Sequence, residues 1–213
     1  MKIVFEDNHL LVVIKPVNVP MQEDESKDLD LLSMAKQYIK TTYNKPGNVY
    51  CGLVHRLDRP VSGVVVFAKT SKAASRLSNQ IRLHQFDKQY TAVVEGLVYP
   101  ETWTDYLVKD SKTNTSKVTT KDKGKYSELE IIDSKHLKTN QSLITIDLKT
   151  GRSHQIRVQC ASRMHPIVGD QRYHPNPIKN QQIKLLAHSL SILHPITQER
   201  MTFTIDYPSW FLK

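Results

Sequence analysis

The chain has few cysteines and no long apolar run. Two of its 213 residues are cysteine, Cys51 and Cys160, and neither belongs to a C-x-x-C pair. A disulfide framework and a thiolate zinc site are therefore both disfavoured. A grouping of Cys160 with His165 and His174 also lacks metal-ligand spacing, so we predict no metal. The apolar run Leu10–Ile14 is too short for a signal peptide or a membrane span, which predicts a cytoplasmic protein with free thiols and no membrane partner.

Acidic residues are in deficit. Lysine and arginine total 30 against 21 for aspartate and glutamate, which gives a formal charge of +9 and an isoelectric point near 9.4. This balance favours a polyanionic partner. The acidic run from Glu23 to Asp30 is expected to be a solvated loop. Between Lys149 and Lys184 the only acidic residue is Asp170. We expect this basic segment to contact phosphates through Lys149, Arg152, Arg157, Arg163, Arg172, Lys179 and Lys184.

The apolar pattern alternates strands and helices early and is dominated by strands later. It predicts a single α+β domain over residues 1–213 with a mixed, mainly antiparallel sheet. The expected helices are Leu29–Tyr43, Ser71–Phe86 with Ser71 as N-cap, and His154–Arg163. The expected strands are Ile3–Phe5 and Leu10–Ile14 as a hairpin, Val49–Val54, Val64–Ala68, Tyr90–Val98, Ser127–Ile132, Ser142–Leu148, Leu185–Leu193 and Met201–Ile205. The polar tract Lys109–Lys125 is interpreted as a solvated loop in preference to a hairpin arm.

The most informative segment is Gly52–Lys69, which reads GLVHRLDRPVSGVVVFAK. It sets Asp58 in a polar turn between two apolar runs, beside His55 and Arg56. The turn therefore combines a carboxylate, a titratable imidazole and a cation. An isolated R-x-D is usually a turn whose aspartate caps backbone amides, so the wider sequence must decide its role.

That wider sequence resembles the RluA-type pseudouridine synthases. The family motif HRLDxxTSG is matched at His55, Arg56, Leu57, Asp58, Ser62 and Gly63, with Val61 where the family usually has threonine. Two further segments resemble the family in the same order, Lys88-Gln89-Tyr90 and the long segment Leu148–Asp170. The long segment departs from the family pattern at Ser153, Gln159 and Met164. The last two departures are expected to alter RNA contacts or local backbone shape.

The resemblance implies a sheet split by a central catalytic cleft and isomerisation of uridine in ribosomal or transfer RNA, without a cofactor. It implies that Asp58 is the catalytic carboxylate, that Arg152 opposes its protonation, and that Tyr90 stacks on the flipped uracil. The aspartate has three possible routes, through a sugar ester, a base adduct or a glycal, and the sequence does not choose among them.

The same motifs supply the candidate RNA-binding residues. Arg56 is expected to fill the space that the flipped base leaves, and His55 to shape the turn through a backbone hydrogen bond. The remaining candidates are His154, Gln155 and Arg157. Relatives often carry a separate N-terminal RNA-binding module, for which we find no residues here, so we expect the catalytic domain or a partner to select the RNA.

Two other functions stay open. A non-catalytic RNA-binding or RNA-folding protein is suggested by the departures at Val61, Gln159 and Met164. A hydrolase of nucleosides or glycans would need a second carboxyl group as acid, and the sequence shows no obvious one near Asp58. We expect a monomer, since no exposed apolar stripe stands out.

Overall fold

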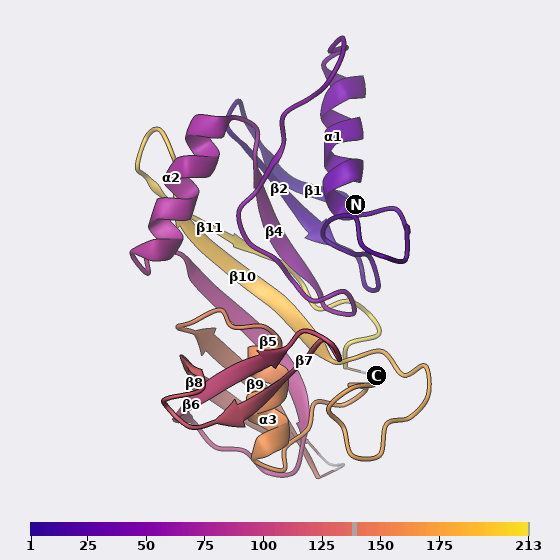
Figure 1. The fold of residues 1–213 in the computed structure, drawn as a ribbon, viewed down its shortest axis with the longest axis vertical. Coiled ribbons are helices and arrows are strands. Elements are labelled where there is room, and N and C mark those ends of the chain that lie inside the picture. Colours follow the sequence, from indigo (N-terminus) through magenta and orange to yellow (C-terminus); the bar gives the residue numbers. More distant parts are fainter. Residues whose placement is uncertain (138–139, 213) are drawn as a thin grey trace. The chain divides into compact units, whose positions relative to one another are not determined.

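The computed structural model describes residues 1–137 and 140–212, which form two compact units (Figure 1). Unit 1 comprises Met1–Asp87 and Ala187–Asp206, and unit 2 comprises Lys88–Leu186 and Tyr207–Lys213. Each unit has its own strands and helices.

The sheet of unit 1 is built around one fully buried strand, β4 (Ser62–Ala68). The hairpin of β1 (Lys2–Glu6) and β2 (Leu10–Lys15) is confirmed, and β2 pairs antiparallel with β4. The other strands are β10 (Leu185–Leu193), β11 (Arg200–Thr204), which pairs with β10, and β3 (Gly52–Leu53), which pairs with the end of β4. The expected strand Val49–Val54 is thus too long, because only Gly52 and Leu53 pair with β4.

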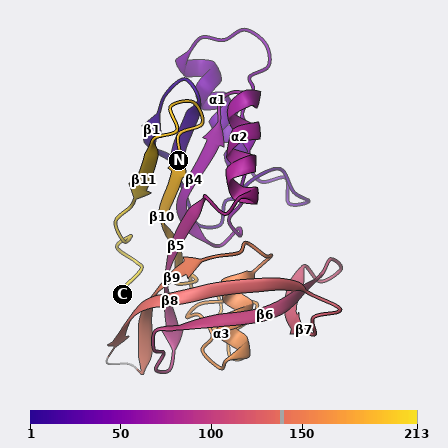
Figure 2. The ribbon, with the colours of Figure 1, turned by 90° about the vertical axis from the view of Figure 1, so that its left-hand side faces the viewer.

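The two helices of unit 1 lie on the same face of this sheet (Figure 2). Helix α1 (Leu31–Thr42) begins where the Asp30 carboxylate accepts from the Ser33 amide at 2.9 Å. The N-cap of helix α2 (Ser71–Arg82) is Thr70, one residue before the predicted Ser71. The Thr70 hydroxyl accepts from the Ala73 amide at 3.1 Å. Both helices bury an apolar stripe, as their periodicity predicts.

Unit 2 is mainly an antiparallel sheet in the order β5-β9-β8-β6-β7. Its strands are β5 (Asp87–Glu95), β6 (Glu101–Asp110), β7 (Thr115–Thr119), β8 (Lys125–Leu137) and β9 (Gln141–Leu148). The interpretation of Lys109–Lys125 as a solvated loop is wrong, because β7 lies within it and pairs with β6. The turn of that hairpin is stabilised by Asp110, whose carboxylate accepts from the Lys112 amide. The α+β class with a mainly antiparallel sheet is confirmed.

Helix α3 (Gln155–Ser162) is buried on every side along its first six residues. It ends in a Schellman motif, in which the His165 amide donates to the Cys160 carbonyl at 3.0 Å. Met164 occupies the left-handed position of that motif, with φ of 61°, and its side chain is 86% exposed. The glycine typical of the family would have this conformation without strain, so the backbone shape persists despite the departure.

This geometry predicts that Met164→Gly stabilises the protein. We expect the free energy of unfolding to rise by about 0.5–1 kcal/mol, because a left-handed residue with a Cβ is strained and the exposed methionine contributes little packing. Urea unfolding of the wild type and the variant would measure the change. Arg163→Gly, at the preceding position with φ of −99°, is the control and should destabilise. A lower unfolding free energy for Met164→Gly would contradict the prediction.

Candidate active site

The turn that carries Asp58 is closed by a backbone hydrogen bond. The Val61 amide donates to the Asp58 carbonyl at 3.0 Å. Leu57 and Val61 are buried on either side of the turn, whereas Asp58 is half-buried. Because the turn is anchored at both ends, the carboxylate is presented from a fixed backbone. The threonine expected at position 61 is replaced by valine without loss of this bond, since the backbone makes it.

A buried lysine holds the turn from beneath. Lys15, the last residue of β2, is 0% exposed, and its Nζ donates to the carbonyls of Arg59 at 2.8 Å, Val61 at 2.7 Å and Pro16 at 3.0 Å. Burial lowers the pKa of Lys15 to about 7, while the Asp58 charge raises it and the Arg59 charge lowers it. Three carbonyl acceptors also favour the ammonium form. Sequence reasoning missed this residue and treated it only as the end of a strand.

Ser62, Gly63 and His55 connect the turn to the sheet. The Ser62 hydroxyl donates to the Lys15 carbonyl at 2.7 Å. At Gly63, with φ of 146°, an added Cβ would lie 2.4 Å from the Ala187 carbonyl oxygen, so only glycine fits. His55 Nε2 accepts from the Val66 amide at 3.1 Å. The predicted backbone hydrogen bond of His55 is therefore confirmed.

Two arginines flank Asp58 in different settings. Arg56 is exposed. Arg59 contacts the acidic loop, with Nη1 at 3.6 Å from an Asp24 carboxylate oxygen, and it is also paired with Asp28. The acidic run is therefore attached to the residue that follows Asp58, and its last member, Asp30, is buried as the cap of α1.

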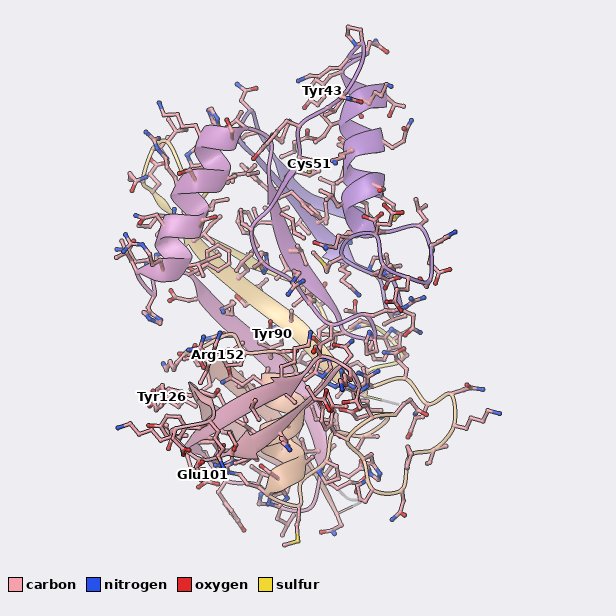
Figure 3. The ribbon with its side chains drawn as sticks, viewed as in Figure 1. Tyr43, Cys51, Tyr90, Glu101, Tyr126 and Arg152 are labelled. Carbon is pink, nitrogen blue, oxygen red and sulfur yellow. The ribbon has the colours of Figure 1, made fainter. Side chains whose placement is uncertain are left out.

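Unit 2 fixes the backbone at Arg152 through the buried side chain of Gln155. The Gln155 Oε1 accepts from the Arg152 amide at 3.0 Å, and its Nε2 donates to the Glu128 carbonyl at 3.0 Å. The Arg152 side chain is exposed, and its Nε donates to the Tyr126 carbonyl at 2.8 Å (Figure 3). Arg152 is thus held at its backbone and at the Nε of its guanidinium, and the residue is otherwise exposed.

Two of the segments that resemble the family meet within unit 2. A Cβ added to Gly151 would lie 3.3 Å from the Lys88 Nζ, so the side chain of Lys88 reaches the residue before Arg152. Burial lowers the pKa of Lys88, and the charge of Asp147 opposes this change. Tyr90, two residues along β5, pairs with Ile146 of β9 and is 8% exposed.

Arg157 is engaged inside unit 2. Its Nε and Nη2 donate to Asp170 at 2.8 and 2.7 Å, and both residues are buried. Burial alone would raise the pKa of Asp170, but Arg157 and the amides of Arg172 and Tyr173 hold it below its usual value. His154 shares a 2.7 Å hydrogen bond between its Nδ1 and the Tyr173 hydroxyl. We infer structural roles for Gln155 and Arg157, which sequence patterns alone did not indicate.

Two cations of the predicted phosphate-contacting segment have acidic partners within unit 2. Arg163 pairs with Asp105 at 2.7 Å, and Lys149 pairs with Glu130 at 3.2 Å. At these two positions an acid offsets the positive charge of the segment. Gln159 is buried and donates to Asp105 at 2.8 Å, so this departure from the family pattern makes a contact inside unit 2.

The described part of the chain offers little for metal or thiol chemistry. Among residues 1–137 and 140–212, no group of three histidines, cysteines or acids is placed to hold a metal ion. Burial raises the pKa of Cys51 to about 12 and also raises that of Cys160, which makes both thiols poor nucleophiles. No helix within these residues has the length and apolar character needed to cross a membrane.

Comparison with known proteins identifies the family. Residues 9–162 match the RNA pseudouridylate synthase family. Ribosomal large subunit pseudouridine synthase C of Buchnera aphidicola subsp. Acyrthosiphon pisum is 32% identical over 210 residues, which cover 91% of this chain and 63% of that protein. The dual-specificity RNA pseudouridine synthase RluA of Escherichia coli is 32% identical over 208 residues, which cover 94% and 90%.

A solved structure shares the fold. The solved structure of human RNA pseudouridylate synthase domain containing 4 has a TM-score of 0.79 at 19% identity, and the match covers 99% of this chain and 90% of that one. The chain spans less than two thirds of the Buchnera relative and nine tenths of the Escherichia coli relative. The motif around Asp58 lies inside the matched residues. The chain belongs to the RNA pseudouridylate synthase family.

Proposed function

We propose that this chain isomerises uridine to pseudouridine within RNA, with Asp58 as the catalytic carboxylate. The observation that carries the proposal is the rigid presentation of Asp58 on a turn that the buried Lys15 holds by the carbonyls of Arg59 and Val61. A reaction that rearranges one nucleotide needs a carboxylate in a fixed place. The family match over residues 9–162 supports the same reaction.

The chemistry requires one carboxylate and no net redox change. The bond between N1 of uracil and C1′ of ribose breaks, the base rotates while bound, and a bond forms between C5 and C1′. The C5 proton leaves and N1 gains a proton, so the atoms balance without water or cofactor. Asp58 acts by attack on the sugar, attack on the base, or removal of a sugar proton, and each route needs its ionised form.

We propose Arg152 as the cation that opposes protonation of Asp58. Arg152→Lys should lower single-turnover pseudouridine formation by about 10²-fold with little change in RNA affinity, because lysine keeps the charge and loses the planar, multiply donating guanidinium. Rapid-quench kinetics and RNA binding would measure the two effects. Arg172→Lys, at an exposed arginine of unit 2, is the matched control. A loss of binding with normal single-turnover rate would assign Arg152 to phosphate contact.

The base must leave its stack before it reacts, which costs a few kcal/mol in structured RNA. We propose that the exposed Arg56 fills the vacated space, and that Tyr90 holds the uracil by stacking. Of the remaining RNA-binding candidates, His154 is half-buried next to Tyr173 and we retain it. Gln155 and Arg157 contribute by fixing the backbone around Arg152 and Asp170, and not by direct contact with RNA.

The substrate is proposed to be ribosomal or transfer RNA. The names of the relatives specify ribosomal large subunit RNA in one case and dual specificity in another. We further propose that the two units act as one catalytic domain, that the protein is a monomer, and that it works in the cytoplasm.

Tritium release from RNA labelled at C5 of uridine tests the function. Unmodified ribosomal and transfer RNA would be offered separately to the wild-type protein. Release from either RNA, with pseudouridine found in the digest, would support the proposal and identify the RNA class. Binding of both RNAs without release would favour a non-catalytic RNA-binding role, and release of free uracil would favour a hydrolase.

A further inference from the structure

Unit 1 contains a polar cavity on residues that the proposed reaction does not use. Its volume is about 510 Å³. It is lined by α2, the residues that follow α2, and the loop between β10 and β11, through Ser75, Arg76, Asn79, Gln80, Gln85, Ile196 and Gln198. Figures 1 and 2 both show that loop beside α2. None of the lining residues is acidic.

The walls of the cavity are fixed by hydrogen bonds. The Gln80 side chain donates to the Leu193 carbonyl at 2.7 Å and accepts from the Leu193 amide at 3.0 Å, so it hydrogen-bonds both backbone groups of the last residue of β10. Arg76 Nη1 donates to the Pro195 carbonyl at 2.6 Å. The cavity is therefore a built feature between α2 and the loop, in which Gln80 and Arg76 are engaged with the backbone and the exposed amides are those of Asn79, Gln85 and Gln198.

The charged side chains of α2, beside the cavity, are all positive. Helix α2 has no acidic residue, and Lys72 and Arg82 are exposed on it. The carboxylate of Asp87, which follows the helix, is paired with Arg200 at 3.0 Å. Glu199 accepts from the hydroxyl of Thr197. The exposed charge of Glu199 is set against the charges of Lys72, Arg76 and Arg82, so the rim has a net positive balance.

We propose that this cavity and the basic face of α2 bind an unpaired nucleotide of the RNA, away from the uridine that is modified. Amide side chains pair with base edges and ribose hydroxyls, and arginine and lysine contact phosphates. A volume of about 510 Å³ lies in the range of small-molecule sites, and the polar lining suits a nucleotide better than an apolar ligand. The proposal rests on the proposed function for the kind of partner, and it adds a second contact for selecting the RNA.

Salt-dependent binding gives the first test. Each lost phosphate contact to single-stranded RNA should reduce the slope of log affinity against log salt by about 0.7. The double variant Lys72→Ala with Arg82→Ala should therefore reduce the slope by about 1.4 for a long RNA fragment. The matched control is Lys36→Ala with Lys40→Ala, which removes two exposed lysines from α1 and should leave the slope unchanged. Equal slopes for the two double variants would overturn the proposal.

Crosslinking gives the second test and locates the contact. Ser75→Cys places a thiol in the cavity wall, and Gln37→Cys places one on the exposed face of α1. The native thiols are buried, so an azidophenacyl reagent should label the engineered ones. Polyuridylate should crosslink to Ser75→Cys and not to Gln37→Cys. Binding of polyglutamate to the cavity without an RNA crosslink would overturn the proposal in favour of an acidic protein partner.

These tests separate the nucleotide site from the reaction. If the wild type released no tritium, crosslinking and salt slopes would still report RNA at α2. If tritium were released but Ser75→Cys gave no crosslink, the proposed function would be supported and the nucleotide site beside α2 would be overturned.

Discussion

Asp58→Asn is expected to lower the rate of tritium release by at least about 10³-fold, the range typical of a lost catalytic carboxylate. Asparagine keeps the size of the side chain and removes its charge, so it neither attacks carbon nor accepts a proton at neutral pH. RNA affinity should change little, because the turn is held by Lys15 through backbone carbonyls that the substitution leaves in place. Single-turnover kinetics and a binding titration on the same RNA would measure both.

The matched control is Asp122→Asn, which neutralises an exposed carboxylate of unit 2 and should leave the rate unchanged. Residual release by Asp58→Asn near the wild-type rate would show that another group performs the chemistry. Unfolding of the variant would be recognised by circular dichroism and by loss of RNA binding, which the proposal does not predict.

Lys15→Met should destabilise the fold by roughly 3–5 kcal/mol, because it leaves three backbone carbonyls without the Nζ donor that they share. Methionine fills most of the volume of the lysine stem, so the effect reports the hydrogen bonds more than a cavity. Urea unfolding would measure the loss. Ser62→Ala, which removes one hydrogen bond to the Lys15 carbonyl, should cost about 1 kcal/mol.

The cost of Lys15→Met should also depend on pH. The pKa of Lys15 is about 7 in the folded chain and 10.5 ordinarily, so between these values the unfolded chain binds a proton that the folded chain has lost. Wild-type stability should therefore rise with pH across this window relative to the variant. A difference between the two proteins that is constant from pH 7 to 10 would contradict the low pKa.

Local patterns predicted those parts of the molecule that depend on neighbours in sequence. The stripes of α1 and α2 follow from helical spacing, and the hairpin of β1 and β2 from a short polar turn between apolar runs. The polar strand β7 was missed because its stability comes from pairing with β6 and not from an apolar pattern.

In the candidate site, too, residues within a local motif were predicted and residues with partners distant in the sequence were missed. Asp58 and Arg56 stand in a local motif, and their candidate roles were predicted from it. Lys15 was missed because its partners lie 44 and 46 residues away, and an isolated lysine at a strand end gives no sign of burial. Arg157 was assigned to RNA for the same reason, since its partner Asp170 comes 13 residues later and only the fold brings the pair together.

The position of Lys15 also bears on the order in which the active turn can arise. Lys15 lies opposite Gly63 in the ladder between β2 and β4, and β4 follows the turn in the chain. A nascent chain that ends before β4 has the lysine and the aspartate but lacks the ladder that brings them into register. The fixed presentation of Asp58 should therefore arise in the same step as pairing of β2 with β4, and it should disappear on heating when unit 1 unfolds.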